Sequence, residues 1–449
     1  MEKKAKIILL CLWIFLFFYI ILSFYLVFIP LNQFASLRSI FYSIGKFFGL
    51  IGFLFLSILI ISGETARFFD KFLGIDKIIK FQRKFSWITT IFVLSHPIFF
   101  LLSTQIAFSS LIPSFMNIPL AAGVVSLYIF LIVMTSSVLY KRISYNTWQF
   151  IHILVYLLFF FIFYHALNIG SDTRNILIMP IFSVIFIVMI IGSIYRINYK
   201  FKQRSFKCYV EEIKTETPDT FTLKIKSNKK LFFKAGQFCF LRLNKDKLYA
   251  RHPFTISSSP NENTLNFTLK ITGRFTKIAS QLKKGDKIIV EGGFGLFTIK
   301  DEDENINKKK LVFIAGGVGI TPFRSIIKDE EEKNNIQNSL RSILLLYGSK
   351  TEKDIIFKKE FDELDKKEKW LKKVYVLSQE NEEKFNKLND KYEKGHIDEL
   401  IIKKYLNEKD IKDSLFYICG PESMKNSVIK ILTDLGVKKE NIFIEDFFW

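Results

Sequence analysis

Three histidines lie inside long apolar stretches of the sequence, where an imidazole is a costly side chain. The chain has 449 residues and five histidines, and His96, His152 and His165 all fall in such stretches. Polar rings at membrane depth are expensive and are usually functional. Haem iron accepts imidazole as an axial ligand from facing helices of a bundle. Ordinary packing would explain one such histidine, but three predict metal-ligating side chains around haem.

The spacing of these histidines places them at two depths. His152 and His165 are 13 residues apart in one stretch, which corresponds to about 20 Å along a helix. His96 lies 15 residues into a different stretch when counted from Gln82, and so reaches the depth of His165. At 3.6 residues per turn, 13 residues leave the two side chains about 140° apart around the helix. Either the rings of His152 and His165 point in different directions or the helix is distorted.

A second group of residues, in the charged half of the chain, has the pattern of a phosphate-binding loop. The apolar run 311–315 leads into Gly316, Gly317 and Gly319, and Thr321 and Pro322 open the next segment. Glycines let a phosphate approach the backbone, and a helix N-terminus supplies N–H donors. A glycine-rich loop is a weak signal alone. The prediction of a phosphate-binding loop is strengthened by three further motifs that follow in order, at 347–350, 395–397 and 417–421.

A third group lies between these two, in the stretch 251–259, which reads Arg-His-Pro-Phe-Thr-Ile-Ser-Ser-Ser. A flavin site needs a hydroxyl near the ring edge, a flat apolar wall and donors for the pyrophosphate. This stretch offers all three. The alternative is a barrel strand that ends in a serine-rich turn.

Six apolar stretches are long enough to cross a bilayer as helices, which takes about 20 residues. A cleavable leader is disfavoured, because the first stretch is long and no small-residue cleavage site follows it. Basic residues gather in the segments 64–81, 141–142 and 196–204, whereas 105–119 has none, so both termini are expected in the cytosol. We call the depth of His96 and His165 the outer level, and that of Gln82 and His152 the inner level. The six predicted spans are 7–29, 39–62, 82–104, 120–140, 149–169 and 175–195.

The second half of the chain reads as two soluble domains. Short alternating runs between 206 and 300 predict an antiparallel β-barrel, and residues 311–449 alternate strand and helix signals, as in a doubly wound α/β domain. The predicted domains are therefore 1–200, 201–305 and 306–449. Although the net charge is +21, the lysines are interleaved with acidic residues, so no nucleic-acid partner is expected. A basic surface that faces anionic lipid accounts for the charge. The four cysteines have no metal or disulfide spacing, which fits a reduced compartment.

The membrane half resembles the ferric reductase / NADPH oxidase superfamily. The segment Trp148-Gln-Phe-Ile-His152, followed by Tyr156 and His165, is similar to the fifth helix of that family. The segment from Gln82 to His96-Pro97 is similar to the third. The resemblance implies two stacked b-type haems, each held by one histidine from each helix. Gln82 departs from it, because it stands where the inner ligand of the third helix is expected.

Gln82 leaves two alternatives open. Either only the outer haem binds, or an inner haem binds through His152 alone with Gln82 as a weak neighbour. The second is favoured on balance, because His152 would otherwise be an unexplained imidazole at membrane depth. Electrons would also have to cover most of about 20 Å in one step.

The soluble half resembles the ferredoxin–NADP reductase family, which implies roles for named residues. Thr255 would approach the flavin N5 while His252, Pro253 and Phe254 flank the cofactor, and the run from Lys270 to Thr276 is similar to the pyrophosphate strand and loop. Cys419, with Gly420 and Pro421, would lie beside the nicotinamide, so Thr255 and Cys419 are the expected catalytic residues. Lys350 and Ser378 would contact a 2′-phosphate, which favours NADPH over NADH, although Gln379 replaces a frequent arginine. Trp449 could stack on the flavin, or it could simply pack in its domain.

The implied activity is an NAD(P)H oxidase or ferric reductase of the cytoplasmic membrane. Electrons would pass from cytosolic NADPH, or NADH, through FAD and haem b to dioxygen or a ferric chelate on the outer face. One alternative is an electron conduit in the bilayer that serves an outer-face partner protein or a quinone. Another, a haem-free flavoprotein with a membrane anchor, is disfavoured by the three membrane histidines.

Overall fold

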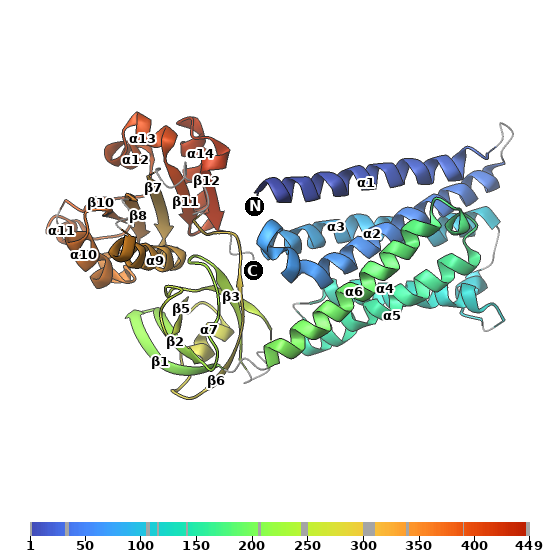
Figure 1. Cartoon of the computed structure of the whole chain (residues 1–449), viewed down its shortest axis with the longest axis horizontal. Coiled ribbons are helices and arrows are strands. Elements are labelled where there is room, and N and C mark those ends of the chain that lie inside the picture. The colour runs from blue at the N-terminus through green and yellow to red at the C-terminus, as the bar shows by residue number, and fades with distance from the viewer. Residues whose placement is uncertain are drawn as a thin grey trace. The chain divides into compact units, whose positions relative to one another are not determined.

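The computed structural model divides into two compact units, Met1–Arg204 and Ser205–Trp449 (Figure 1). It describes residues 2–31, 36–104, 108–114, 116–140, 142–204, 208–243, 250–299, 310–337, 341–388 and 390–445. The division falls four residues after the predicted boundary at 200, because the last helix of the N-terminal unit runs on to Arg204.

The N-terminal unit is a bundle of long helices. Within the described residues, six helices are long and apolar enough to cross a membrane. Four of them form two closely packed antiparallel pairs, α2 with α3 and α4 with α5, while α1 and α6 pack mainly against α2. The predicted six-helix bundle is therefore confirmed. The helices are α1 (Glu2–Phe28), α2 (Leu37–Leu73), α3 (Ile75–Thr104), α4 (Ile118–Val138), α5 (Tyr145–Ile169) and α6 (Met179–Arg204).

The segment 64–81, which lies between the second and third predicted spans, is helical apart from one residue. α2 continues to Leu73, and α3 begins at Ile75. Gly74 makes the turn with φ +78°, and the Asp70 carboxylate accepts a hydrogen bond from the Ile75 backbone N–H at 2.8 Å. Because a glycine adopts positive φ at little cost, one residue suffices to reverse the chain.

The C-terminal unit begins with an antiparallel sheet whose strand order is β4-β3-β6-β1-β2-β5. Alternating apolar residues of these strands fill its core, as the two-residue period of a strand requires. A short helix, α7 (Arg274–Ala279), follows β5. The strands are β1 (Cys208–Thr217), β2 (Thr220–Ser227), β3 (Phe238–Leu243), β4 (His252–Thr255), β5 (Leu265–Lys270) and β6 (Lys287–Phe294).

The rest of the unit is a parallel sheet with the order β10-β9-β8-β7-β11-β12. Its central strands are continuous apolar runs, as expected for strands that are covered on both faces. The strands are β7 (Leu311–Gly316), β8 (Ile343–Ser349), β9 (Leu371–Leu377), β10 (Tyr392–Lys394), β11 (Leu415–Cys419) and β12 (Ile442–Glu445). The helices are α9 (Thr321–Gln337), α10 (Lys358–Lys367), α11 (Glu382–Phe385), α12 (Glu399–Tyr405), α13 (Glu408–Asp413) and α14 (Glu422–Asp434). The 3₁₀ turns among the described residues of both units are η1 (Phe108–Leu111), η2 (Asp172–Arg174), η3 (Gly317–Ile320), η4 (Glu352–Asp354) and η5 (Lys439–Asn441).

Strand β7 lies between β8 on one side and β11 on the other. The order of the strands reverses at this point, and in open parallel sheets ligands bind at the carboxyl ends of the two strands that flank such a reversal. The predicted fold class is confirmed: a membrane helix bundle, then an antiparallel barrel-type sheet, then a doubly wound α/β domain.

Candidate functional site

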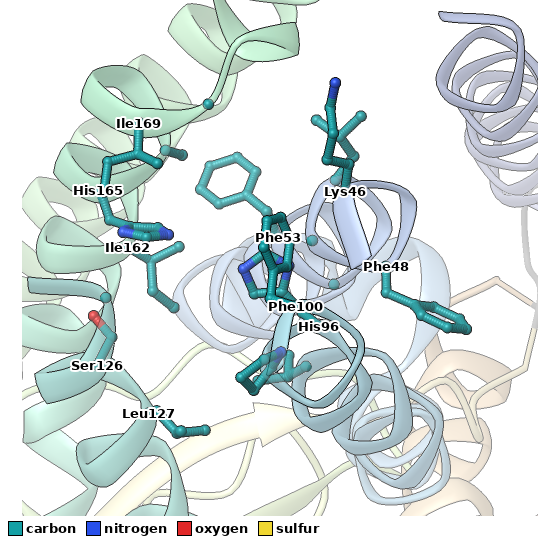
Figure 2. Close-up of a pocket in the computed structure, with 18 of the residues that line it drawn as sticks. Lys46, Phe48, Phe53, His96, Phe100, Ser126, Leu127, Ile162, His165 and Ile169 are labelled. Carbon is teal, nitrogen blue, oxygen red and sulfur yellow. The ribbon is translucent and has the colours of Figure 1, made fainter. Parts of the chain in front are cut away.

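The structure brings His96 and His165 together at the outer level. Their ring centroids are 6.3 Å apart and the ring planes are inclined by 83°. Both side chains line one cavity of about 290 Å³, which they enter from α3 and α5 (Figure 2). The other lining residues are predominantly apolar and come mainly from α2 to α5, among them Phe53, Phe100 and Ile162.

A backbone carbonyl holds each of these imidazoles. His96 Nδ1 lies 2.8 Å from the carbonyl oxygen of Gly45 on α2, and His165 Nδ1 lies 2.9 Å from that of Pro119 on α4. A carbonyl oxygen only accepts hydrogen bonds, so Nδ1 carries the hydrogen in both rings. Each Nε2 therefore keeps its lone pair and is available to a metal, in the usual arrangement for a metal-binding histidine.

A glycine beneath each ring makes this arrangement possible. A Cβ atom on Gly49 would lie 2.6 Å from Nδ1 of His96, and one on Gly123 would lie 2.5 Å from Nδ1 of His165. In both cases the glycine stands four residues after the residue whose carbonyl accepts the hydrogen bond. Small residues let helices approach closely in membranes. The roles of Gly49 and Gly123 were not predicted, although glycines inside apolar stretches were a usable signal.

The geometry at the outer level fits an iron ion between two imidazoles. With metal–nitrogen bonds of about 2.0 Å, and each ring nitrogen roughly 1 Å from its ring centre, opposed imidazoles have centroids about 6 Å apart. The distance of 6.3 Å between the ring centroids of His96 and His165 agrees with this. The apolar cavity and the two oriented histidines are thus a suitable environment for a b-type haem.

An ion pair lies at the outer end of the same cavity. Nζ of Lys46 on α2 is 2.8 Å from Oδ2 of Asp172 in η2, and both residues line the cavity. Both side chains are about one-fifth exposed, so the pair is partly shielded from solvent. Neither residue was predicted to belong to the site.

The inner level is arranged differently. The amide of Gln82 donates hydrogen bonds to the carbonyl of Leu59 and the hydroxyl of Ser62, both on α2, at 3.1 and 3.0 Å. His152 stacks on Trp148 with ring centroids 4.3 Å apart. Its Nδ1 is buried, and no hydrogen-bond partner for it occurs among the described residues. Gln82 and His152 therefore do not reproduce the pairing seen at the outer level.

In the C-terminal unit, Thr255 has the environment expected of a flavin-binding hydroxyl. It ends β4, pairs with Phe238 of β3, and is 3% exposed. Its Oγ1 is buried and has no hydrogen-bond partner within the described part of the chain. Because a buried hydroxyl without a partner is unfavourable, Oγ1 is suited to a hydrogen bond with a bound ligand.

The neighbours of Thr255 on β4 divide between the two faces of the strand, as successive strand residues do. His252 and Phe254 both stack on Phe275, with ring centroids 4.1 and 5.5 Å apart, whereas Pro253 alternates with them. Burial lowers the pKa of His252, so its imidazole is neutral near pH 7. His252 and Phe254 thus form an aromatic wall with Phe275.

Lys270 and Thr276, predicted to contact a pyrophosphate, both have partners within the protein. Nζ of Lys270 lies 2.9 Å from Oδ2 of Asp219. The hydroxyl of Thr276 accepts hydrogen bonds from the backbone N–H groups of Thr272 and Gly273, at 3.0 and 3.1 Å. Thr276 therefore shapes the loop before α7, and Lys270 is tied to the adjacent turn.

The glycine-rich loop lies at the carboxyl ends of β7 and β11, where the strand order reverses. Added Cβ atoms show how closely its residues pack: one on Gly316 would lie 2.8 Å from Cδ of Pro421, and one on Gly319 would collide with the carbonyl of Cys419. Gly317 has φ +54° and open space around it. The predicted motifs 316–322 and 417–421 are thus adjacent, and Gly420 of the second packs closely against Gly316 of the first.

Two hydroxyls fix this loop. Tyr347, fully buried on β8, donates to the carbonyl of Gly317 at 3.0 Å, and Thr321 donates to that of Val318 at 3.1 Å. Burial raises the pKa of Tyr347, so the phenol stays protonated and able to donate. Pro322 follows in the first turn of α9, where its missing N–H costs nothing. The positioning role of Tyr347 was not predicted.

The Cys419 side chain is fully buried and belongs to the core beneath the parallel sheet. Its backbone carbonyl packs closely against Gly319 of the glycine-rich loop. Lys350 and Ser378 follow neighbouring strands, and the two segments are joined by a hydrogen bond from the Gln379 N–H to the Lys350 carbonyl at 2.8 Å. Ser378 also donates to the carbonyl of Ser349 at 3.4 Å. Trp449 lies outside the described residues.

Three family models match successive parts of the chain. The ferric reductase like transmembrane component matches residues 48–163, the FAD-binding domain matches 205–323, and the oxidoreductase NAD-binding domain matches 313–430. The first match covers His96 and most of α2 to α5, and ends two residues before His165. The other two span the strand that carries Thr255 and the glycine-rich loop.

Among curated proteins, two relatives are Na(+)-translocating NADH-quinone reductase proteins, in each case the F component of that enzyme. The chain is 36% identical over 176 residues to the one from Marinomonas sp. (strain MWYL1), over 39% of this chain and 40% of that protein. For the one from Yersinia enterocolitica, the identity is 36% over 167 residues, or 37% of this chain and 38% of that protein. The chain thus spans about two-fifths of the length of these relatives.

Similar solved structures cover about half of the chain. A ferredoxin NADP+ reductase from Neisseria gonorrhoeae with bound FAD and NADP is 21% identical, over 54% of this chain and 99% of that chain, with a TM-score of 0.45. The cytochrome b5 reductase domain of Ulva prolifera nitrate reductase is 21% identical, over 54% of this chain and 98% of that chain, with a TM-score of 0.46.

The family matches and the membrane helices together make the chain an integral membrane oxidoreductase with FAD-binding and NAD(P)-binding domains. A ferric-reductase-type membrane domain followed by these two domains is the architecture of the ferric reductase / NADPH oxidase superfamily, to which this chain belongs.

Proposed function

We propose that this protein passes electrons from cytosolic NAD(P)H through FAD and haem b to an acceptor on the outer face of the cytoplasmic membrane. The observation that carries the proposal is the pair His96 and His165, held 6.3 Å apart in an apolar cavity by two backbone carbonyls. A purely structural role, in which these histidines merely pack the bundle, does not explain why each ring keeps Nε2 available.

The residues of the chain bind and orient, while the cofactors supply the redox chemistry. When bound, FAD takes up two electrons from the nicotinamide and haem iron carries one at a time, so together they connect a two-electron donor to a one-electron acceptor. Thr255 Oγ1 holds the flavin edge. The loop 316–322 binds the pyrophosphate of the nicotinamide nucleotide at the start of α9, where N–H groups point outward.

Dioxygen, giving superoxide, and ferric chelates are the acceptors we propose. Both are reduced by one electron, which suits a haem donor. The positive-inside distribution of Lys and Arg supports the direction of transfer, because it favours an orientation with both termini in the cytosol. Lys46 and Asp172 then lie toward the outer face, between the cavity and the acceptor.

Proteoliposomes test the transmembrane step directly. Ferricyanide is enclosed in the lumen, NADPH is added outside, and reduction of the enclosed dye is followed for the full chain. We expect reduction by the wild-type protein, and none by His96→Ala or His165→Ala, in which the low-spin b-type spectrum is also lost. Both variants should still reduce a soluble dye outside the vesicles, because the C-terminal unit is unchanged. An unaltered spectrum in both variants would remove the basis of the proposal.

A second candidate function is delivery of electrons to a quinone or to a partner protein at the outer face. The observation that favours it is the identity of the curated relatives, which belong to NADH-quinone reductases. A purified protein that oxidises NADPH only after a soluble quinone or the partner is added would support this candidate. Turnover with dioxygen or ferric citrate alone would support the first.

A further inference from the structure

We propose that this chain binds a single haem, at the outer level, and that its inner level is closed by contacts between helices. The inference rests on the proposed haem site of His96 and His165, and it concerns what the residues at the other depth do. It follows from a comparison of Gln82 and His152 with the two outer histidines.

Gln82 makes the same contacts with α2 as His96 does, displaced by fourteen residues on both helices. His96 donates to the carbonyl of Gly45 and lies over Gly49. Gln82 donates to the carbonyl of Leu59, fourteen residues after Gly45, and lies over Gly63, fourteen residues after Gly49. The amide nitrogen of Gln82 is 3.2 Å from the position of a Cβ on Gly63. Gln82 therefore occupies the position against α2 that corresponds to the position of His96 at the outer level.

In that position, Gln82 is unsuited to bind haem iron. Its Nε2 donates both hydrogens, to Leu59 and to Ser62, and an amide nitrogen has no available lone pair. The acceptor nature of the Leu59 carbonyl fixes which amide atom faces α2. The remaining carbonyl oxygen is a hard donor that suits Mg²⁺ or Ca²⁺ better than haem iron.

On the α4 side of the inner level, the residues that correspond to Pro119 and Gly123 are not arranged to hold an imidazole. Fourteen residues after Pro119 and Gly123 on α4 come Val133 and Ser137. The Val133 carbonyl already accepts hydrogen bonds from the hydroxyls of Ser136 and Ser137, both at 2.8 Å. A serine thus stands where the outer level has a glycine. Consistently, Nδ1 of His152 is buried with no hydrogen-bond partner among the described residues.

A polar cluster also joins the helices at this depth. Glu64 of α2, which is 3% exposed, accepts a hydrogen bond from Tyr156 of α5 at 2.6 Å and pairs with Arg196 of α6 at 2.5 Å. Arg196 also donates to the Tyr156 hydroxyl at 3.0 Å. At this depth, α2, α5 and α6 are thus joined by hydrogen bonds and an ion pair between their side chains.

The cavity itself stops short of this cluster. Its lining reaches Leu56 on α2, Val93 on α3 and Ile162 on α5, and includes neither Gln82 nor His152. A haem at the inner level would have to separate the buried Glu64 from Tyr156 and Arg196 without gaining a ligand from α3. The sequence-based preference for an inner haem on His152 alone is thus outweighed by these contacts. About 21 Å along α3 then separates Gln82 from the haem ligand His96. Because no second haem divides this distance, the flavin has to lie close to the inner level to pass its electrons on.

Haem-to-protein stoichiometry tests the inference. The full chain is purified in detergent, its haem is measured by the pyridine haemochrome method, and its protein by amino-acid composition. We expect one haem per chain. His152→Ala should retain that haem with an unchanged low-spin spectrum, whereas His165→Ala, the matched change on the same helix, should lose it.

Gln82→Leu provides a second measurement that does not depend on the folding of a histidine variant. Because the amide is not a ligand, its haem content should equal that of the wild type. Two haems per wild-type chain would overturn the inference and leave the outer site intact. Loss of haem in His152→Ala or Gln82→Leu would also overturn it, because the bound haem would then depend on the inner level. A wild-type chain without haem would instead overturn the proposed function.

Discussion

Arg324, in the first turn of α9, donates a hydrogen bond to the backbone carbonyl of Ser257 at 2.6 Å. Ser257 lies two residues after Thr255, so this bond joins the helix that follows the glycine-rich loop to the segment that follows β4. The next residue repeats the link, because the Ser325 hydroxyl donates to the Ser258 carbonyl at 2.6 Å. The serine-rich turn, which was predicted from the sequence to be part of a flavin-binding motif, therefore also connects the two domains through hydrogen bonds.

We expect Arg324→Met to slow reduction of the flavin by NADPH several-fold while FAD content stays normal, because hydride transfer depends on the relative position of the two domains. Stopped-flow absorbance of the bound flavin measures this rate. Lys328→Met, one turn further along α9, is the matched control, since Lys328 pairs with the acidic side chains of Glu331 and Glu360. Equal slowing in both variants would point to a general loss of helix charge instead.

Thr255→Ala should lower the rate of flavin reduction by about tenfold, the value of one hydrogen bond of roughly 1.4 kcal/mol. Retention of FAD should change little, because the rest of the site is unaltered. Thr255→Ser keeps the hydroxyl and should restore most of the rate. Reduction of the Thr255→Ala variant at the wild-type rate would show that this hydroxyl does not contact the reacting part of the flavin.

Lys350 is exposed next to Ser378, and we expect it to give a modest preference for NADPH. Lys350→Ala should reduce kcat/KM with NADPH by about tenfold, because one charge-assisted contact to the 2′-phosphate is lost. The value with NADH should be nearly unchanged. Lys353→Ala, at an exposed position in η4, is the control for a general loss of positive charge. A wild-type protein that uses NADH as well as NADPH would contradict the expectation.

Features that depend on one segment of sequence were predictable. Each membrane helix contains an apolar run of bilayer length, and the common depth of His96 and His165 follows from helical rise alone. The glycines of 316–319 are recognisable because a buried strand precedes them and a helix follows. Physical rules that act along the chain were enough for these features.

Features that depend on contacts between distant segments were not predictable. The carbonyls that hold His96 and His165 belong to other helices, and so do Gly49 and Gly123. Whether Gln82 is a weak ligand or a packed amide is decided by Leu59 and Ser62, 23 and 20 residues away. Tyr347 was passed over because its target, the Gly317 carbonyl, is 30 residues distant.

The role of the contacts that hold the His96 ring can be tested without replacing a haem ligand. Gly49→Ala places a Cβ 2.6 Å from Nδ1 of His96, closer than real contacts allow, so the ring must move away from the Gly45 carbonyl. We expect haem content to fall at least several-fold, and any remaining haem to show a weakened low-spin spectrum. Gly123→Ala should act in the same way through His165, because its Cβ would lie 2.5 Å from Nδ1 of that ring.

Gly52→Ala is the matched control, because Gly52 is three residues away on α2 and lines the same cavity. Its Cβ would meet Val93 at 3.4 Å, an ordinary van der Waals distance, and would not touch a histidine. We therefore expect near-normal haem content in this variant. If Gly52→Ala loses as much haem as Gly49→Ala, then haem binding depends on the volume of the cavity rather than on the position of the His96 ring. If neither variant loses haem, the carbonyl-held imidazole is not what binds the iron.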